Sequence, residues 1–338
     1  MADAALPMNL ALQGGGAHGA FTWGVLDALL EADRFSFEGV SGASAGAMNA
    51  LCLAHGLMTG GRDGARQMLA DFWTTIAQQS PFSPPPEASA AVAPALKLML
   101  QWTDYLSPEQ LNPLDLNPLR DVLAERFDFA RRRRDCPVKL FIAATHANSG
   151  KLRIFRNHEL SVDALLASAC LPTIHRTIVI DGEPYWDGGY SANPAVFPLL
   201  YQCHAPDILL VLLTPLRYQE TPATAVEIKQ RLRELSFNAT FLREMRMFAH
   251  MREQIGNTWL PDWIPLGRFE RRISRLRFHA ISGEGLLEEL PADSKLAVNL
   301  PFFEKLRDSG RAHAQHWLAQ HRSQLGHSAT LDLNALFY

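Results

Sequence analysis

Two units of strand, tight turn and helix open the chain. In the first, an apolar run at residues 8–13 predicts a buried strand, three glycines interrupt it, and an apolar stripe over residues 20–32 predicts a helix. In the second, an apolar run at 37–40 stops at a glycine-containing turn, and the small apolar residues 45–58 predict a helix that a pair of glycines ends. Strands and helices therefore alternate from the start of the chain.

Three later segments extend this pattern. Residues 138–145 and 208–213 are apolar runs of strand length, and residues 177–186 predict a hairpin that turns on Asp181-Gly182. Strands that alternate with helices favour a parallel or mixed sheet with helices on both faces. We therefore expect an α/β fold with a mostly parallel central sheet.

Two stretches depart from the alternation. Residues 81–94 are rich in proline and alanine, which predicts a surface linker or the base of a lid. Residues 224–255 predict one long amphipathic helix, because its apolar positions recur every three or four residues. These positions are Ile228, Leu232, Leu235, Leu242, Met245, Phe248, Met251 and Ile255. An apolar loop with Trp259 and Trp263 follows the predicted helix.

The composition is typical of soluble globular proteins. Of the 338 residues, 47% are hydrophobic and 20% are charged, and no apolar run approaches the roughly 18 residues that cross a bilayer. The four cysteines are widely spaced without a CxxC pair, which excludes a disulfide scaffold and an ordinary zinc ribbon. No signal peptide is visible at residues 1–7. We therefore expect a cytoplasmic protein with reduced thiols.

The net charge of −3 is unevenly distributed along the chain. Residues 217–277 carry 12 Lys or Arg against 7 Asp or Glu, a net charge of +5, whereas the stretches before and after them are acidic. Proteins that bind nucleic acid usually have a broadly basic domain, so this profile argues against a nucleic-acid partner. The run Arg131–Arg134 is bracketed by aspartates, and we interpret it as a solvated helix end.

The strongest chemical signal is the sequence Gly42-Ala43-Ser44-Ala45-Gly46, which lies between a predicted strand and a predicted helix. A serine on so sharp a turn has strained backbone angles, and its neighbours two positions away must lack side chains for strand and helix to close. The turn exposes the hydroxyl at a helix N-terminus, where developing negative charge is favoured. This context predicts that Ser44 is a nucleophile.

The glycine-rich sequence at residues 14–19 has two interpretations. It satisfies G-x-G-x-x-G, and Glu38 follows close to where a dinucleotide-binding fold places its ribose carboxylate. The same glycines can instead form an oxyanion hole, because amides without side chains can be aimed at a carbonyl oxygen. We prefer the second interpretation, since it explains the glycine loop and the serine turn together.

A nucleophilic serine needs a base. Seven late histidines, His279 among them, could complete a conventional triad, yet none lies in a distinctive turn. Asp187 lies at the end of the predicted hairpin, and the two glycines that follow allow the backbone to approach another segment closely. A carboxylate beside a serine could take the serine proton directly. From the local sequence alone, a structural turn aspartate also remains open.

The glycine loop, the serine turn and the Asp187 turn, in this order along the chain, resemble the motifs of the patatin-like phospholipase family. That family is also similar to the catalytic domain of cytosolic phospholipases. The resemblance rests on the serine turn at Ser44, the glycine loop at residues 14–19 and Asp187-Gly188-Gly189. Residues 167–172 are similar to a further block of the family. The resemblance covers residues 8–215.

This resemblance implies a three-layer α/β/α fold and hydrolysis of lipid acyl esters or related acyl esters, with no metal and no other cofactor. It implies a Ser44–Asp187 dyad without histidine and an oxyanion hole in the glycine loop. The oxyanion-hole residues are Gly14, Gly15 and Gly16, and the other motif glycines are Gly19, Gly42, Gly46, Gly188 and Gly189. His18 departs from the family, which commonly has Arg or Lys at that place in the loop.

The resemblance also suggests a division of the chain. Residues 8–215 are expected to form the patatin-like catalytic domain. Residues 216–338 receive no help from the family and are expected to form a largely helical C-terminal elaboration packed on that domain. The basic stretch 217–277 also suggests transient contact with a membrane surface through Trp259 and Trp263.

Two rivals from other classes remain open on the sequence. A nucleotide-dependent oxidoreductase would use Gly14, Gly16, Gly19 and Glu38, and nicotinamide titration would detect it. A catalytically idle lipid-binding protein would keep the fold but form no acyl-enzyme.

Overall fold

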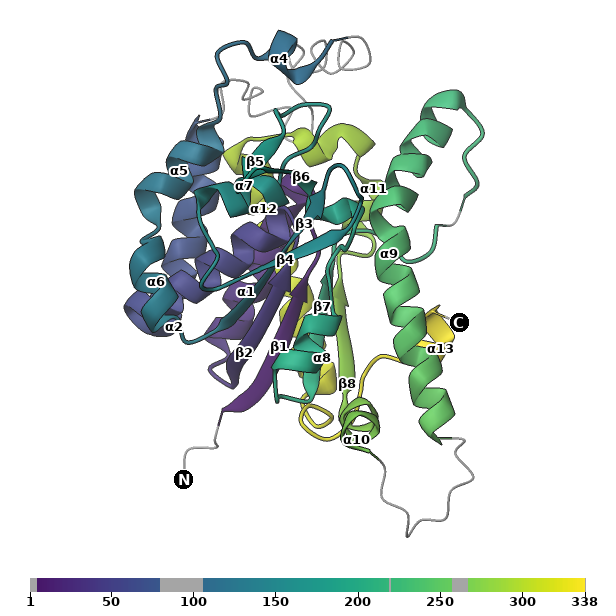
Figure 1. The fold of residues 1–338 in the computed structure, drawn as a ribbon. Coiled ribbons are helices and arrows are strands. Elements are labelled where there is room, and N and C mark those ends of the chain that lie inside the picture. Colours follow the sequence, from purple (N-terminus) through teal and green to yellow (C-terminus); the bar gives the residue numbers. More distant parts are fainter. Residues whose placement is uncertain (1–4, 80–105, 219, 257–266, 338) are drawn as a thin grey trace.

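A mixed sheet forms the centre of the molecule (Figure 1). The computed structural model describes residues 5–79, 106–218, 220–256 and 267–337. Within them the sheet has eight strands in the order β5-β6-β3-β2-β1-β7-β8, and β4 pairs with β3. Five of the strands form a parallel part of the sheet, in which each strand is parallel to its neighbours. They are β1 (Leu6–Leu12), β2 (Phe35–Gly42), β3 (Lys139–His146), β7 (Asp207–Leu212) and β8 (Arg277–Ser282). Antiparallel pairing adds β4 (Leu152–Arg156), β5 (Ile178–Ile180) and β6 (Glu183–Asp187).

Helices cover both faces of this sheet (Figure 1). The first face is covered by α1 (Gly19–Glu31), α2 (Ala45–Gln79), α5 (Pro118–Arg126), α6 (Phe129–Asp135), α7 (Val162–Ser168) and α12 (Leu300–His321). The second face is covered by α8 (Phe197–Gln202), α9 (Ala225–Gly256), α10 (Arg268–Arg275) and α13 (Leu333–Phe337). Shorter turns are α4 (Pro108–Leu111), α11 (Leu286–Glu289), η1 (Gly16–His18), η3 (Gly188–Tyr190) and η4 (Ala292–Leu296). The α/β fold class with a mostly parallel sheet is therefore confirmed.

Strand β7 shows why the sheet needs cover on both sides. All six of its residues are buried. Leu209 and Val211 pack into the core under α1 and α2, whereas Leu210 and Leu212 pack into the core under α8 and α9. Successive side chains of a strand point to opposite faces, so an uninterrupted apolar run requires a helical layer on each face.

The strands and helices that the sequence predicts within the described residues are confirmed, with several additions and one correction. The predicted linker at residues 81–94 lies outside the described residues. The glycine pair Gly60-Gly61 interrupts α2, but a second helical segment continues from there to Gln79. Strands β4 and β8 were not predicted, because their sequences mix polar and apolar residues. The prediction of a solvated arginine run is wrong for one member: Arg132 is fully buried, with its guanidinium 4.9 Å from the Phe129 ring.

The C-terminal part of the chain contributes directly to the central fold. Strand β8 extends the sheet beyond β7, and helix α12 packs along α1. A Cβ on Gly24 of α1 would lie 1.9 Å from the carbonyl oxygen of Arg307, and one on Gly310 of α12 would lie 2.1 Å from that of Phe21. Glycine at both contact points lets the two backbones approach. How the chain divides into domains stays a prediction.

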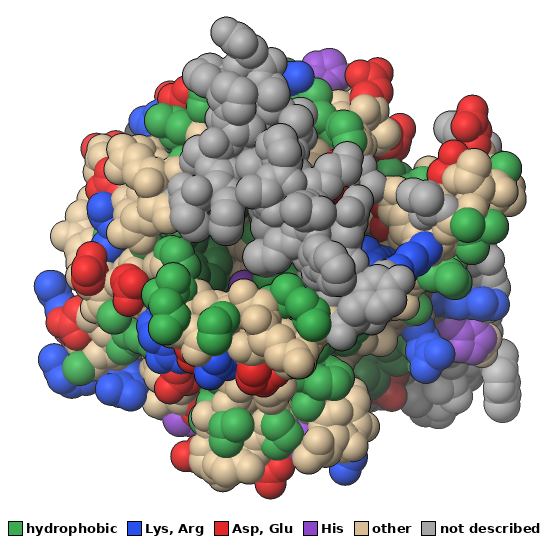
Figure 2. Space-filling view, turned by 90° about the horizontal axis from the view of Figure 1, so that it is seen from above, with side chains coloured by type: hydrophobic (Ala, Val, Ile, Leu, Met, Phe, Trp, Pro, Cys, Tyr) green, Lys and Arg blue, Asp and Glu red, His purple; other side chains and the backbone are tan. Residues whose placement is uncertain are grey.

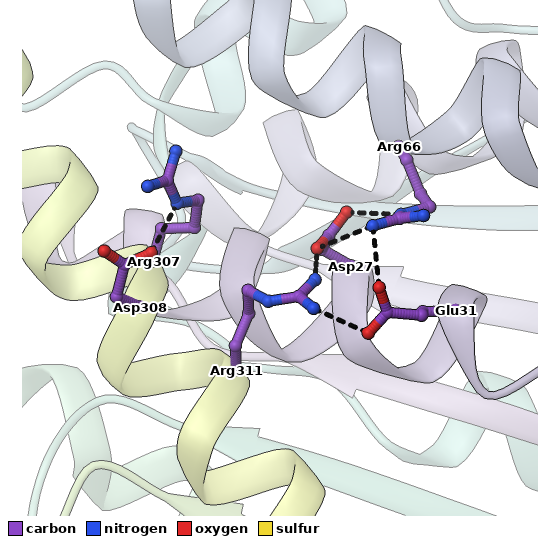
Figure 3. A network of polar contacts seen from close by, with 6 residues as sticks. All are labelled: Asp27, Glu31, Arg66, Arg307, Asp308 and Arg311. Atoms are coloured by element: carbon purple, nitrogen blue, oxygen red, sulfur yellow. Dashed lines mark hydrogen bonds and ion pairs between the residues drawn. The ribbon is translucent and has the colours of Figure 1, made fainter.

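An ionic network reinforces this packing (Figure 3). Asp27 and Glu31 of α1 accept from Arg66 of α2 on one side and from Arg311 of α12 on the other. The Asp27 side chain is only 12% exposed, so solvent screens its ion pairs less than those of a surface carboxylate. The network therefore links the N-terminal and C-terminal parts of the chain. None of the described helices is long and apolar enough to cross a membrane.

We predict that Gly310→Ala destabilises the whole protein. The added methyl would meet the Phe21 carbonyl oxygen, a backbone atom that cannot move without separating α1 from α12. Overpacking of this kind costs about 1–3 kcal/mol. Gly60→Ala is the matched control, because a Cβ there would have no atom within 4 Å. Equal urea midpoints for the two variants would show that the α1–α12 contact adapts freely.

Candidate active site

Ser44 lies in a strained turn between β2 and α2. Its φ is +52°, in the left-handed region that side chains other than glycine rarely adopt. A Cβ on Gly42 would lie 2.5 Å from the carbonyl oxygen of Gly46, and a Cβ on Gly46 would lie 2.2 Å from that of Leu12. Both positions therefore require glycine for the strand and helix to close around Ser44. The surrounding structure holds the serine in this conformation.

The amide of Ser44 is held by a second segment. It donates to both the carbonyl oxygen and the Oγ of Ser168, each at 3.1 Å. Ser168 is the last residue of α7 and is fully buried. The Ser44 amide is thus occupied, and Ser168 positions the serine turn. In the sequence, Ser168 stands out only as a member of the family-like block at residues 167–172.

Pairing along β3 brings Asp187 to Ser44. Gly42, near the end of β2, pairs with Ile142 of β3, and Asp187, at the end of β6, pairs with Ala144 two residues further along. Strand β4 pairs with both Ile142 and Ala144, so it occupies the other edge. Strands β2 and β6 therefore meet end to end along one edge of β3, which places the two predicted catalytic residues side by side.

The carboxyl group of Asp187 is buried, and few interactions stabilise its negative charge. The residue is 1% exposed; its Oδ1 accepts from the Gly189 amide at 2.7 Å, and the Ser44 side chain lies close enough to stabilise its ionised form. Burial raises the pKa of Asp187 from its ordinary value to about 7, although these two interactions lower it. A carboxylate with this pKa is a much better base near neutral pH than an exposed aspartate.

Four contacts fix the backbone around Asp187. Its amide donates to the Cys170 carbonyl at 2.8 Å, and its carbonyl accepts from Thr145 Oγ1 at 2.7 Å. A Cβ on Gly188 would lie 2.2 Å from the Ala143 carbonyl oxygen, and one on Gly189 would lie 2.4 Å from the Phe237 ring. The two motif glycines therefore allow β3 on one side and helix α9 on the other to approach closely.

The glycine loop lies against the serine turn, but Gly14 does not have a free amide. A Cβ on Gly14 would lie 2.6 Å from the Ala43 carbonyl oxygen and 2.9 Å from Ser44 Cβ. The Gly14 amide donates to Asn193 Oδ1 at 2.7 Å. The prediction that Gly14 donates to an oxyanion is therefore corrected, because its single N–H is already used.

Gly15 and Gly16 are different. Their amides donate to no other group within the described part of the chain. Gly16 has a φ of +57°, and a Cβ on it would lie 2.3 Å from the carbonyl oxygen of Lys295 in η4. Gly19, at the start of α1, lies so close to Ala45 that the two Cβ atoms would be 2.6 Å apart. The loop and the serine turn thus start adjacent helices that pack against each other.

A buried polar bracket supports the loop. Gln13 accepts from the amides of Leu213 and Thr214, and its Nε2 donates to Asn238 Oδ1 at 2.9 Å. Asn238 is on α9, and Asn193, the partner of the Gly14 amide, also accepts from Gln13 through its carbonyl oxygen at 3.4 Å. Residues from three other segments therefore hold the glycine loop. No local pattern in the sequence indicates this bracket, because its members have no common spacing.

His18 is a packing residue and does not face a ligand site. It is 3% exposed, and its Nε2 lies 2.8 Å from Ser294 Oγ. Burial and the nearby ammonium group of Lys295 lower the pKa of His18 to about 3, so its ring is neutral. Burial also lowers the pKa of Lys295, against the attraction of Glu234 on α9. The positive charge beside the glycine loop therefore comes from the C-terminal part of the chain.

The structure does not support the two alternative interpretations of these motifs. Glu38 lies four residues before the end of β2, where it accepts from the amides of His204 and Ala205 and from Lys139. A ribose carboxylate would instead lie at the carboxyl end of the strand. His279 is buried in β8, and its Nε2 lies 2.9 Å from Asp207 Oδ1, at the start of β7. Neither residue is placed for the role that its rival function requires.

One family model and two solved structures are similar to this chain. A family model described as patatin-like phospholipase matches residues 10–200. Among solved structures, the chain is similar to VipD from Legionella pneumophila, with 15% identity, a TM-score of 0.40, and coverage of 94% of this chain and 67% of that one. It is also similar to the heterodimeric complex ExoU-SpcU from the type III secretion system of Pseudomonas aeruginosa. For that structure the identity is 14% and the TM-score 0.31, with 94% of this chain and 76% of the other covered.

A search of curated protein sequences found no match. The family model, however, spans more than half of the chain and contains both turns that form the site. It also extends past Asp187 and Asn193, so the residue that pairing along β3 brings to Ser44 and the residue that accepts from the Gly14 amide fall within it. This chain therefore belongs to the patatin-like phospholipase family.

Proposed function

We propose that this protein is a serine hydrolase that cleaves acyl esters of lipids through an acyl-Ser44 intermediate. One observation carries the proposal: the pairing of β2 and β6 along β3 places Ser44, on a strained turn at a helix N-terminus, beside a buried carboxyl group whose pKa burial raises to about 7. Family membership supports lipid as the substrate class. Ser44 and Asp187 form the catalytic dyad, and no histidine is required.

In the first step, Ser44 Oγ attacks the ester carbonyl carbon while Asp187 accepts the hydroxyl proton. The carbonyl oxygen gains the negative charge, and the amides of Gly15 and Gly16 donate to it. The ammonium group of Lys295, whose charge lowers the pKa of His18 at the end of the same loop, favours the same state. The tetrahedral intermediate then expels the alcohol, which takes the proton back from Asp187.

In the second step, water attacks the acyl-Ser44 carbonyl carbon while Asp187 accepts a proton from that water. The same two amides hold the second oxyanion, and its collapse releases the fatty acid and restores the Ser44 hydroxyl. Every proton transfer uses Asp187, and every charge stabilisation uses the protein backbone or Lys295. The mechanism assigns no step to a metal or another cofactor.

The proposed catalytic domain, residues 8–215, depends on the rest of the chain at its active site. Phe237 and Asn238 of α9 contact Gly189 and Gln13, and Lys295 of η4 contacts Gly16. We therefore propose that residues 216–337 complete the active site. We also propose that the protein acts at a lipid surface, which it contacts transiently.

Loss of either dyad member should abolish catalysis. We expect Ser44→Ala and Asp187→Ala each to remove ester hydrolysis, and the double variant to be little worse than either one, because the two residues act as a unit. A fluorophosphonate that reacts with activated serines should label the native protein but not Ser44→Ala. Ser149→Ala, which removes an exposed serine, is the control. An unlabelled native protein would favour the catalytically idle alternative.

The pH dependence should follow Asp187. Only the ionised carboxylate accepts the serine proton, so kcat/KM on a soluble ester should rise with pH with a midpoint near 7. Glu244 provides a control with the same pKa: burial raises it to about 7, and its carboxylate accepts from the Val196 and Phe197 amides at the start of α8. Glu244→Gln should keep the wild-type profile. If the pH profile of this variant shifts, the assignment of Asp187 as the base is wrong.

A stability measurement tests the same pKa without turnover. Because burial raises the pKa of Asp187, the folded protein holds its proton where the unfolded chain has lost it, so this group costs stability increasingly between pH 4 and pH 7. Asp187→Asn cannot ionise. Its stabilising effect should therefore grow over that range and stay constant above it, and a pH-independent effect would contradict the assigned pKa.

Crowding the glycine loop should impair turnover more than binding. In Gly15→Val the new side chain would press on Leu213, whose Cδ1 would lie 3.1 Å from the added Cβ, and this would displace the neighbouring amides. Losing one oxyanion donor typically costs about 10² to 10³ in kcat. Adding Leu213→Ala should restore part of the loss by making room. An increase in KM alone would indicate that the loop binds substrate without stabilising the oxyanion.

A further inference from the structure

The apolar stripe of α9 is buried along only half of the helix. In the C-terminal half, Met245 and Phe248 are buried in the core beneath the sheet. In the N-terminal half, Ile228, Leu232 and Leu235 are 44%, 59% and 49% exposed. These three residues follow one another at helical spacing, so they form a continuous apolar strip on one side of the helix. Packing on the domain therefore accounts for one half of the predicted stripe and not for the other.

The orientation of this half is set by its inner side. Phe237 packs on Gly189, and its ring centroid lies 4.5 Å from that of Tyr190, while Asn238 is bonded to Gln13. These contacts fix one side of α9 against the active site, so the apolar strip faces away from the body of the molecule. In Figure 1 the N-terminal end of α9 projects above the sheet, at the end where the parallel strands finish.

Other exposed apolar side chains lie at the same end of the sheet. Leu114 and Leu116, between α4 and α5, are 77% and 68% exposed, and Val179, in the β5–β6 hairpin, is 59% exposed. Figure 2, which looks down on this end, shows hydrophobic atoms on the projecting part and around the centre. Of the eleven large hydrophobic residues exposed in the described part of the chain, six belong to these segments. They are Leu114, Leu116, Val179, Ile228, Leu232 and Leu235.

The serine turn opens at this same end. Ser44 follows the carboxyl end of β2, and Asp187 pairs with β3 near the carboxyl end of that strand. The β5–β6 hairpin extends past the end of β3 on one side, and the first turns of α9 extend past it on the other (Figure 1). The exposed apolar residues therefore flank the direction from which a substrate reaches Ser44.

We propose that this end of the molecule docks on a lipid surface, with the strip Ile228, Leu232 and Leu235 of α9 inserted among the lipids. The proposal rests on the proposed function and deepens it, because it names the surface that meets the substrate. Exposed Lys229 and Arg233 lie between the apolar residues of the strip, where their charges would meet anionic headgroups. Trp259 and Trp263 lie outside the described residues and take no part in it.

The charge and position of the strip favour lipid over a protein partner. An apolar side chain gains free energy when it leaves water, and basic side chains beside it add attraction to an anionic surface. A lipid ester must also leave the lipid aggregate to reach Ser44. Docking of the segments that flank Ser44 on the lipid surface shortens this path. The other occupant that such a strip could have is a second copy of this chain, which the experiment separates.

The test compares two triple variants in the full chain. Ile228→Gln/Leu232→Gln/Leu235→Gln removes the strip and keeps good helix-forming residues on α9. Tyr201→Gln/Met247→Gln/Leu336→Gln is the matched control, because those residues are 64%, 53% and 45% exposed but lie outside the flanking segments. Both carry Ser44→Ala, so the lipid stays intact. Binding is measured by sedimentation with vesicles of equal parts phosphatidylcholine and phosphatidylglycerol.

We expect Ser44→Ala alone and the control variant to bind the vesicles, and the strip variant to bind at least tenfold more weakly. With Ser44 restored, the strip variant should lose activity on vesicles and keep it on a soluble short-chain ester. Equal binding of all three proteins, or no binding by any, would overturn the proposal. So would a dimer in sedimentation velocity that only the strip variant abolishes. If the native protein binds vesicles but cleaves neither substrate, the proposed function fails and the docking surface stands.

Discussion

The arrangement of the active site depends on the register of strand β3. This strand pairs with the end of β2 through Ile142 and with the end of β6 through Ala144, so it aligns the segments that end in Ser44 and Asp187. A shift of one residue along β3 would turn the opposing side chains to the other face of the sheet. Strand β4 pairs with the opposite edge of β3, so β3 lies between β4 on one edge and β2 with β6 on the other. The contact between two residues far apart in sequence is therefore a consequence of sheet hydrogen bonding.

Burial then gives this contact its chemical character. Asp187 is buried at the junction of the two strand ends, and its interactions with the Gly189 amide and the Ser44 side chain do not compensate fully for the loss of hydration. Because its pKa is raised to about 7, Asp187 destabilises the folded protein near neutral pH. The same raised pKa makes its carboxylate useful as a base at that pH. The strained backbone of Ser44 adds to this destabilisation. Well-packed helices on both faces of the sheet offset both effects.

The C-terminal part of the chain is joined to the site as closely as the family-like part. Strand β8 extends the sheet, α12 crosses α1 at two glycines, and α9 packs Phe237 against Gly189 and bonds Gln13 through Asn238. Lys295 brings a positive charge to the glycine loop, where His18 is buried and neutral. The helix that packs beside Asp187 and the glycine loop also carries the exposed strip that we assign to lipid. Catalysis and contact with substrate would thus share one structural element.

Local patterns in the sequence predicted the main strands and helices and the positions of the two turns. Apolar periodicity predicted the core strands and α9, and glycine spacing predicted the turns at Ser44 and Gly14, because backbone conformation and side-chain direction are local properties. Three features follow from tertiary contacts alone: Asn193 accepts a hydrogen bond from the Gly14 amide, Arg132 is buried, and half of the apolar stripe of α9 is exposed to solvent. Hydrogen-bond partners, burial and pKa depend on segments that lie more than a hundred residues apart along the chain, and no local pattern records which of them will meet.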